Sequence, residues 1–363
     1  MVSFRGAGTL GRWGAWLLLG CVVATHLDAA TLRVFGSAGA ESLFTPANCS
    51  SPLNPRNIAS IPRTANTGDA AAFIDATGND RAWKIHLKLR ADSSDRAADR
   101  LRASEAFLQL SPRPWLDITA GRIIEKWGTG YAWNPAAFVS PPKNPADPND
   151  RRSAYRGTDA LKADLFFSGT SVSLYAMQHQ RFAARVYRLI LGTDVSLHLY
   201  RDRDGMRQGV SLARVIGDAL EIHGEVSRRH ALAGVQYTFR HNVNVVAEVY
   251  RSGEGLTRSG WEEVRQLAQR DLREANRRFA PLQMARNYAF VRLDVPFAKY
   301  DVETIAITNL RDASSILRLT LTRKLLSNVS AYLIDTEFLG GSGSELSYVQ
   351  IKRAVTAGAR LYF

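Results

Sequence analysis

Cysteine is almost missing from this chain. Its 363 residues include two cysteines, Cys21 and Cys49. If the chain is cleaved after Ala30, Cys49 alone remains, so no intramolecular disulfide, cysteine metal cluster or haem-attachment pair can form. Residues 18–21 loosely resemble a lipoprotein signal that would lipidate Cys21, but Leu19 is not the small residue usual at that position. Lipidation of Cys21 is therefore the less favoured alternative. Stability must then come from a sheet and its surroundings.

Long apolar runs are also scarce. Residues 14–25 form the only one, and it is too short for a helix that spans a bilayer of about 30 Å. Two arginines precede the run, and the small residues Ala29 and Ala30 follow it, which completes the three parts of a secretory signal. We therefore predict a signal peptide at 1–30 and one mature unit at 31–363.

Acidic residues are too few to balance the basic ones. The chain has 34 aspartates and glutamates against 47 lysines and arginines, a net charge of +13. Such a balance favours anionic partners. An exported protein does not usually meet nucleic acid, so we expect lipopolysaccharide phosphates or anionic solutes instead, and no nucleic acid.

Signatures of catalysis and of cofactor binding are missing as well. No serine lies in a nucleophile-elbow context, no histidine pair has helical metal-ligand spacing, and no glycine-rich phosphate loop is present. His223 lies between Glu221 and Glu225 on one strand face, which suits either a metal or proton site or a lumen histidine whose hydrogen bonds are satisfied, and we favour the second. We expect no enzyme, no metal and no cofactor.

What the chain does have is alternation of period two. In residues 83–90 the apolar Trp83, Ile85, Leu87 and Leu89 alternate with charged residues, as in a strand with two different faces. Similar segments recur about every ten residues with turn signals between them, which indicates an all-β array.

The last nine residues alternate to the end of the chain. In residues 355–363, Val355 and Leu361 fall on the apolar face with Phe363, while Arg360 falls on the other. This segment resembles the C-terminal signature strand of Gram-negative outer-membrane β-barrel proteins. The resemblance implies an all-β fold, a transmembrane antiparallel up-and-down β-barrel of about 16 to 18 strands. It also implies that Phe363 is read by the barrel-assembly machinery.

The order of loops and turns agrees with such a barrel. Counting strands backwards from Phe363 places every short turn at one end and the long loops 91–102, 128–156 and 251–286 at the other, as outer-membrane barrels require. The count gives about 16 strands from Trp83 onward and about 18 with a weaker N-terminal pair. Arg122 and Arg214 fall in apolar register, which suggests bulges or slips at these positions.

The faces opposite the apolar ones are polar and charged, so a barrel of this size should enclose a wet lumen. Most of these residues need only be solvated, but a stack of cations on one strand can also attract anions. The candidate pore-lining and anion-binding residues are Lys84, His86, Lys88, Arg90, Arg151, Arg152, Arg188, Arg292 and Arg318.

The proline-rich loop 128–156 is the best candidate for specificity. A Gly-Arg strand that leads through Trp127 to Asn134 and Pro135 is loosely similar to a group of porin-like barrels. Prolines stiffen the segment, so it either folds into the pore as a constriction or packs as a rigid external loop. As a constriction it would offer Lys143 and the arginines at 151, 152 and 156 to anions.

A second long loop contains a helix. Within residues 252–283, Ser259 and Glu262 have capping-box spacing, and apolar residues from Trp261 to Phe279 repeat every three or four positions. We predict one helix that forms a lid on the barrel mouth, with its arginines towards lipopolysaccharide phosphates or solvent. A helix that binds a partner is the alternative.

Together these features predict a porin-like channel in the outer membrane that lets small hydrophilic, chiefly anionic, solutes diffuse passively. One alternative is a plugged barrel that serves as a scaffold or binding partner in an outer-membrane assembly, and a second is an outer-membrane hydrolase. The expected partners are outer-membrane lipid, lipopolysaccharide and small solutes. A homo-oligomer or an unidentified protein partner is also compatible with the sequence.

Overall fold

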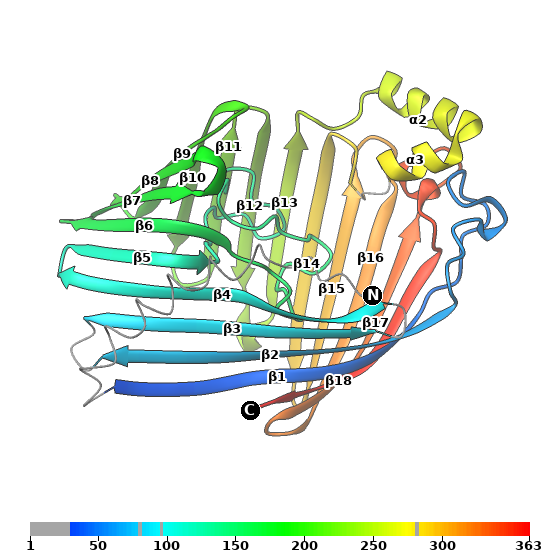
Figure 1. Cartoon of the computed structure of the whole chain (residues 1–363). Coiled ribbons are helices and arrows are strands. Elements are labelled where there is room, and N and C mark those ends of the chain that lie inside the picture. Colours follow the sequence, from blue (N-terminus) through cyan, green and yellow to red (C-terminus); the bar gives the residue numbers. More distant parts are fainter. Residues whose placement is uncertain (1–29, 79–81, 95–96, 280–282) are drawn as a thin grey trace, which may run out of the picture.

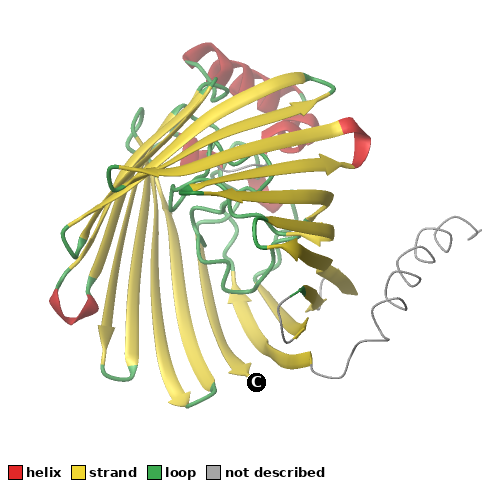
Figure 2. Ribbon diagram, turned by 90° about the vertical axis from the view of Figure 1, so that its left-hand side faces the viewer, coloured by secondary structure: helices red, strands yellow, loops and turns green. Residues whose placement is uncertain are grey.

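Eighteen antiparallel strands form one closed sheet (Figures 1 and 2). The computed structural model describes residues 30–78, 82–94, 97–279 and 283–363. Each strand pairs with its sequence neighbours, and β18 pairs with β1, so that no edge is left open. The signal peptide predicted for residues 1–30 lies, except for Ala30, outside the described residues.

The elements follow one another in a simple meander. The strands are β1 (Ala30–Phe44), β2 (Thr64–Gly78), β3 (Trp83–Ser94), β4 (Ala97–Arg113), β5 (Leu116–Ile123), β6 (Thr158–Phe167), β7 (Thr170–Met177), β8 (Arg181–Ile190), β9 (Thr193–Asp202), β10 (Gly205–Ile216), β11 (Leu220–Ser227), β12 (His230–Thr238), β13 (Asn244–Ser252), β14 (Asn287–Phe297), β15 (Tyr300–Asn309), β16 (Ser315–Leu326), β17 (Val329–Leu339) and β18 (Arg353–Tyr362). The helices are α2 (Arg258–Arg270) and α3 (Leu272–Phe279). The 3₁₀ turns are η2 (Pro55–Asn57), η3 (Gln178–Gln180), η4 (Arg240–Asn242) and η5 (Glu345–Tyr348).

The C-terminal strand closes the barrel, as the terminal alternation predicts. Ser37 of β1 pairs with Tyr362 of β18, and Phe44 pairs with Val355. The Gly36 N–H donates to the Phe363 carbonyl at 2.7 Å, which carries the closure to the last residue. An antiparallel meander closes only with an even number of strands, and the predicted count of 18 is confirmed.

Long connections gather at one end of the barrel and short turns at the other. The long ones are residues 45–63, 124–157, 253–286 and 340–352. The predicted loop at 91–102 is wrong, because β3 continues to Ser94 and β4 begins at Ala97. The polar residues of this extension form cross-strand ion pairs, such as Arg102 with Asp92 at 3.4 Å. In the sequence alone, a run of such polar residues is typical of a loop.

The outer face carries a belt of exposed apolar side chains, among them Leu197, Val249 and Leu319. Arg122 and Arg214 also point outwards, but the expected bulges at these positions are not present: both ladders are regular there. Arg122 Nε instead donates to Asp159 Oδ1 at 2.8 Å, close to the end of β5. A long arginine near the end of a strand can extend towards the polar interface, so apolar register does not require a bulge.

Two helices, not the predicted one, form in the loop 253–286. Asp271 leaves helical geometry (φ −145°, ψ 88°), and its carboxylate accepts the Glu274 N–H at 2.9 Å, which starts α3. Thr257, not Ser259, caps α2, since its hydroxyl accepts the Gly260 N–H at 3.2 Å. None of the helices in the described ranges is long and apolar enough to cross a membrane.

The predicted position of the helical segment as a lid is confirmed, because both helices pack over the mouth of the barrel (Figure 1). Trp261, Val264 and Ala275 are buried with Tyr348 of η5 in one apolar cluster. The cluster continues onto the inner wall, where Val246, Phe290, Ile305, Ile307 and Ile316 lie at 0 to 2% exposure. The predicted polar and charged inner face is therefore interrupted on β13 to β16, which bury apolar side chains under the folded loops.

Candidate functional site

The loop of residues 124–157 lies inside the barrel and not outside it (Figure 2). Its contacts reach opposite parts of the wall. Arg152 pairs with Glu41 of β1 at 2.9 Å, while the Thr129 N–H donates to Glu225 of β11 at 2.5 Å. Of the two placements that the sequence allows, the structure has the constriction, and we call this segment the constriction loop.

Two buried carboxylates on the wall hold the constriction loop. Glu225 of β11 accepts the backbone N–H groups of Thr129 at 2.5 Å, Gly130 at 2.7 Å and Ala136 at 2.9 Å. The residue is only 3% exposed. Hydrogen bonds to a charged acceptor are about twice as strong as neutral ones, so Glu225 fixes the course of the loop across the lumen.

Glu248 of β13 binds the next two residues of the constriction loop in the same way. It accepts the N–H groups of Tyr131 and, at 2.8 Å, of Ala132, and His223 Nε2 lies 2.8 Å from its Oε1. We refer to Glu225 and Glu248 together as the carboxylate clamp. His223 is 1% exposed at its side chain, so it is a buried lumen histidine bound to the clamp, which agrees with the satisfied lumen histidine favoured from the sequence.

Gly128 is required where the loop passes the clamp. Its φ of +84° is unfavourable for residues with a side chain, and a Cβ there would lie 2.5 Å from Glu225 Oε1. The preceding Trp127 is 1% exposed. Its ring packs 5.3 Å from Tyr175 and 5.0 Å from His198, between centroids, which fastens the loop entrance to β7 and β9.

Lys143 takes part in this packing and is not offered to solutes. Its ammonium donates to the Gly130 carbonyl. Burial lowers the pKa of Lys143, and the carboxylates of Glu248 and Glu225 partly oppose that change. Its predicted role as an anion contact is therefore wrong, while Arg156 is exposed at the end of the loop.

A cavity of about 260 Å³ remains between the constriction loop and the wall formed by β16, β17, β18 and β1. Its charged lining consists of Glu41, Asp147, Arg151, Arg152, Arg318 and Arg360. Four guanidinium groups thus face two carboxylates, an excess of two positive charges. We call this space the arginine cavity.

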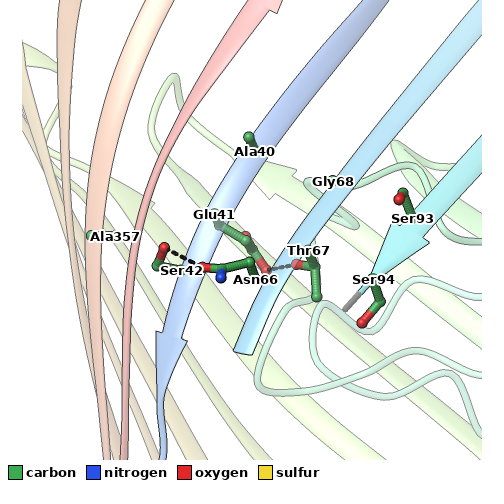
Figure 3. A pocket seen from close by; sticks show the side chains of 9 residues that line it. All are labelled: Ala40, Glu41, Ser42, Asn66, Thr67, Gly68, Ser93, Ser94 and Ala357. Atoms are coloured by element: carbon green, nitrogen blue, oxygen red, sulfur yellow. Dashed lines mark hydrogen bonds between the residues drawn. The ribbon is translucent and has the colours of Figure 1, made fainter. Parts of the chain in front are cut away.

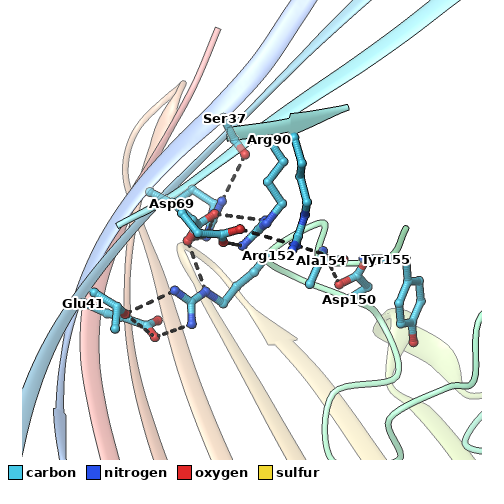
Figure 4. Close-up of polar contacts among 12 residues, drawn as sticks. Ser37, Glu41, Asp69, Arg90, Asp150, Arg152, Ala154 and Tyr155 are labelled. Carbon is cyan, nitrogen blue, oxygen red and sulfur yellow. Dashed lines mark hydrogen bonds and ion pairs between the residues drawn. The ribbon is translucent and has the colours of Figure 1, made fainter. Parts of the chain in front are cut away.

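On the β1 and β2 side, the arginines are held by carboxylates (Figure 4). Asp69 accepts from Arg360 at 2.8 Å and from Arg152 at 3.1 Å, and it lies 3.6 Å from Arg90. Arg152 also pairs with Glu41. Asp69 and Arg90 have side chains that are 2% exposed, so these arginines chiefly bind the loop to the wall.

On the β16 side, the positive charge is less compensated. Arg318 donates from Nη1 to the Ala146 carbonyl, its Nε has no hydrogen-bond partner, and no carboxylate in the described part of the chain lies within ion-pair distance. Arg151 pairs with Asp147 at 3.1 Å and keeps 30% of its side chain exposed. These two arginines are the groups best placed to meet an anion in the cavity.

The predicted basic ladder on β3 faces the lumen, but three of its four members, Lys84, His86 and Arg90, have carboxylate partners. Lys84 lies 3.8 Å from Asp75, and His86 lies 2.6 Å from Asp75 and 3.5 Å from Glu105. Lys88 is 5% exposed. The ladder is thus a mixed-charge strip and not a column of free cations.

The remaining two predicted pore-lining residues, Arg292 and Arg188, lie on opposite faces of the barrel wall. Arg292 faces the lumen but is bound by Glu303 at 2.7 Å and Asp294 at 3.0 Å. Arg188 is misplaced by the prediction: it pairs in register with Val195 on the outer face. Arg185 of β8 does face the lumen, where it donates to Ser196 at 3.1 Å.

Sequence reasoning missed Arg360, Glu41 and Asp69. Arg360 stands on the mixed face of the terminal strand, opposite Phe363, so alternation alone could have placed it in the lumen. Glu41 and Asp69 belong to long N-terminal strands whose many small residues weaken the alternation.

The same small residues form a shallow groove of about 440 Å³ on the outer face of β18, β1, β2 and β3 (Figure 3). Paired residues share a face, and Ser42 pairs with both Asn66 and Ala357. Its hydroxyl donates to Asn66 Oδ1 at 2.7 Å. This part of the outer wall lacks the large apolar side chains of the belt, and the homo-oligomer expected as one alternative stays a prediction.

The histidine and serine side chains give the hydrolase alternative no support. The described residues contain no group of three or more His, Cys, Asp or Glu side chains that could hold a metal ion. Ser211 lies 2.9 Å from His198, but both are almost fully buried, and His198 Nδ1 has no hydrogen-bond partner in the described part of the chain. This pair lacks both the orienting carboxylate and the access that a catalytic serine needs.

Comparison with known proteins identifies the fold. No family model matches the sequence. No curated protein sequence matches it either. Among solved structures, Pseudomonas aeruginosa OpdQ aligns with a TM-score of 0.56 and 7% identity over 92% of this chain and 97% of its own. A triple mutant of the Rhodopseudomonas blastica porin aligns with a TM-score of 0.53 and 12% identity over 92% and 100%. The chain therefore has a porin-like transmembrane β-barrel fold, which confirms the predicted fold class.

Proposed function

We propose that this protein is an outer-membrane channel through which small hydrophilic solutes diffuse passively, with a preference for anions. The observation that carries the proposal is the arginine cavity, where Arg318 and Arg151 face a space of about 260 Å³ beside the constriction loop. Porin-like neighbours of the fold support the channel, and the charge of the cavity supports the preference.

The mechanism combines electrostatic attraction with a steric limit. Guanidinium groups in a narrow passage between protein walls raise the local concentration of anions and repel cations. The constriction loop limits solute size, and the carboxylate clamp keeps it in position. Tight pairs such as Arg360 with Asp69 shape the passage without adding net charge to it.

A plugged barrel is the second candidate, and one observation favours it. The helices, the outer loops and the inner wall of β13 to β16 share one apolar cluster, which fills part of the outer mouth. Such a cap would suit a scaffold for an external partner. The cluster reaches Ile316 of β16 and Tyr348 of η5, so it adjoins the side of the lumen that holds the arginine cavity.

Removal of residues 141–150 tests the channel and the constriction together. The purified variant and the wild type would be compared by single-channel recording in planar bilayers, after heat-modifiable migration shows that both are folded. We expect discrete openings in the wild type and a larger conductance in the deletion variant, because the loop no longer narrows the lumen. Equal conductance would contradict the constriction, and absence of current in both would favour the scaffold.

A further inference from the structure

A row of four rings crosses the inner wall on β1 to β4. Phe35 stacks on Phe73 with centroids 4.9 Å apart, Phe73 lies 6.4 Å from His86, and His86 lies 5.0 Å from Phe107. Phe35 pairs in register with Phe73, and His86 with Phe107, so the members of each pair share a face. We call this row the aromatic strip.

The aromatic strip faces the lumen. His86 pairs in register with Asp75, and Phe73 with Lys88, two strand positions from Arg90 and its lumen-facing ion pair with Asp69. Because the side-chain period of a strand is two, these residues share that inner face. The strip therefore lies on the inner wall next to the ion pair of Arg90 and Asp69, nearer to the end of the barrel with the short turns.

The strip begins at the arginine cavity. Tyr362 lines that cavity and is 50% exposed. It pairs with Ser37, to which Arg360 donates at 3.0 Å. Phe35 lies two positions from Ser37 on the same face, about 7 Å along the strand. A solute that leaves the cavity along β1 thus meets Tyr362 and then Phe35.

Exposed phenylalanine is unusual on a wetted, charged wall. Phe35 is 43% exposed, and apolar surface of this kind is unfavourable in water unless another surface covers it. Cations reinforce the rings: Lys88 Nζ lies 5.2 Å from the Phe73 centroid and Lys84 Nζ 5.9 Å from that of Phe107. A planar ring of a solute would find stacking partners here.

We propose that the aromatic strip is a binding subsite for the ring of small aromatic anions, whose charged group is held in the neighbouring arginine cavity. The inference rests on the proposed function for the anionic end of the solute, and it adds the recognition of the ring. Aromatic anions would then bind in the lumen more tightly than aliphatic anions of the same size.

The test compares benzoate, cyclohexanecarboxylate and acetate. Binding to detergent-solubilised full-length protein would be measured by equilibrium dialysis, which needs no ion current. We expect benzoate to bind several-fold more tightly than cyclohexanecarboxylate, because the two differ in the planar ring and hardly in size. The double variant Phe35→Leu, Phe73→Leu should remove this difference, while Phe182→Leu on the outer face, 53% exposed, should keep it.

Equal binding of benzoate and cyclohexanecarboxylate by the wild type would overturn the inference, as would an unchanged preference in the double variant. Planar-bilayer recording separates this failure from that of the proposed function. An anion-selective current without any preference for benzoate overturns the strip alone. Absence of current overturns the channel, while dialysis still decides whether the strip binds aromatic rings.

Discussion

Asp69 shows how single residues divide the work in the lumen. Three arginines converge on its carboxylate from β3, β18 and the constriction loop. Arg318, by contrast, has only a carbonyl as partner among the residues that the structure describes. Similar residue types thus serve two purposes, since the paired arginines stabilise the wall and the unpaired one remains available to solutes.

Replacing Asp69 should destabilise the barrel. The Asp69→Asn variant leaves buried guanidinium groups without their counter-charge, and we expect a loss of about 3 kcal/mol in the free energy of unfolding. Urea unfolding in lipid vesicles measures the change. Glu254→Gln is the control, because Glu254 and its partner Arg229 are 61% and 62% exposed, and its effect should stay below about 0.5 kcal/mol. Equal effects of the two variants would contradict the assigned role.

The buried Glu345 should make the stability of the outer cap, formed by α2, α3 and the loops packed against them, depend on pH. It is buried and accepts from Tyr288 Oη at 2.7 Å, Asn309 Nδ2 at 2.9 Å and the Met284 N–H at 2.6 Å. Burial raises the pKa of Glu345 above its usual 4.5. The folded cap therefore binds the proton more tightly than the unfolded chain, and its stability falls as the pH rises from 4.5 to the raised pKa.

Hydrogen exchange of residues 258–279, corrected for the intrinsic effect of pH, measures this dependence. Protection should decrease as the pH rises through that window in the wild type. The Glu345→Gln variant removes the titrating group and should lose that part of the pH dependence. Parallel pH profiles for the two proteins would show that Glu345 does not control the cap.

At the scale of elements, the constriction loop depends on the carboxylate clamp. Glu225→Gln removes the charge that three backbone N–H groups share, and charge-assisted bonds of this kind contribute about 1.5 to 3 kcal/mol. We expect a noisier open level in single-channel records, because the loop moves more freely. Glu221→Gln on the same strand is the control, since Glu221 is 35% exposed and, among the described residues, its ion pair is with His223 and not with the loop. If both variants were as quiet as the wild type, the clamp would not be what holds the loop.

Strands and their order could be predicted from the sequence because alternation and turn residues are local signals. The helix break at Asp271 could not, since it depends on a cap that forms only when the helix stops. The register of β8 was also misjudged: Arg185 and Arg188 lie three positions apart and so face opposite sides. The extension at 91–102 looked like a loop because its polar residues pair with one another.

The candidate site was only partly predictable. Arg151, Arg152 and Arg318 lie around the arginine cavity, and their predicted role in binding anions stays a prediction. The pairing of Arg152 could not be predicted, since Glu41 and Asp69 approach it from strands far away in the sequence. The closed barrel, and not any single segment, decides which arginine keeps a positive charge without a neighbouring carboxylate.

At the scale of the whole molecule, the barrel joins an apolar outer belt, an apolar cap at the mouth and a cationic passage that adjoins the cap along β16. Eighteen strands leave room for a loop that crosses the lumen, and the clamp fixes that loop against β11 and β13. The arginine cavity is what remains beside β16 to β18 and β1. Selection among ions should therefore arise at this one side of the lumen.

The reversal potential in a potassium chloride gradient tests this account most directly. For the wild type we predict a reversal potential displaced towards the chloride equilibrium potential, since Arg318 and Arg151 favour anions. The double variant Arg318→Gln, Arg151→Gln should shift it towards zero, while Arg214→Gln, an outer-face arginine, should leave it unchanged. A reversal potential on the potassium side in the wild type would contradict the anionic passage.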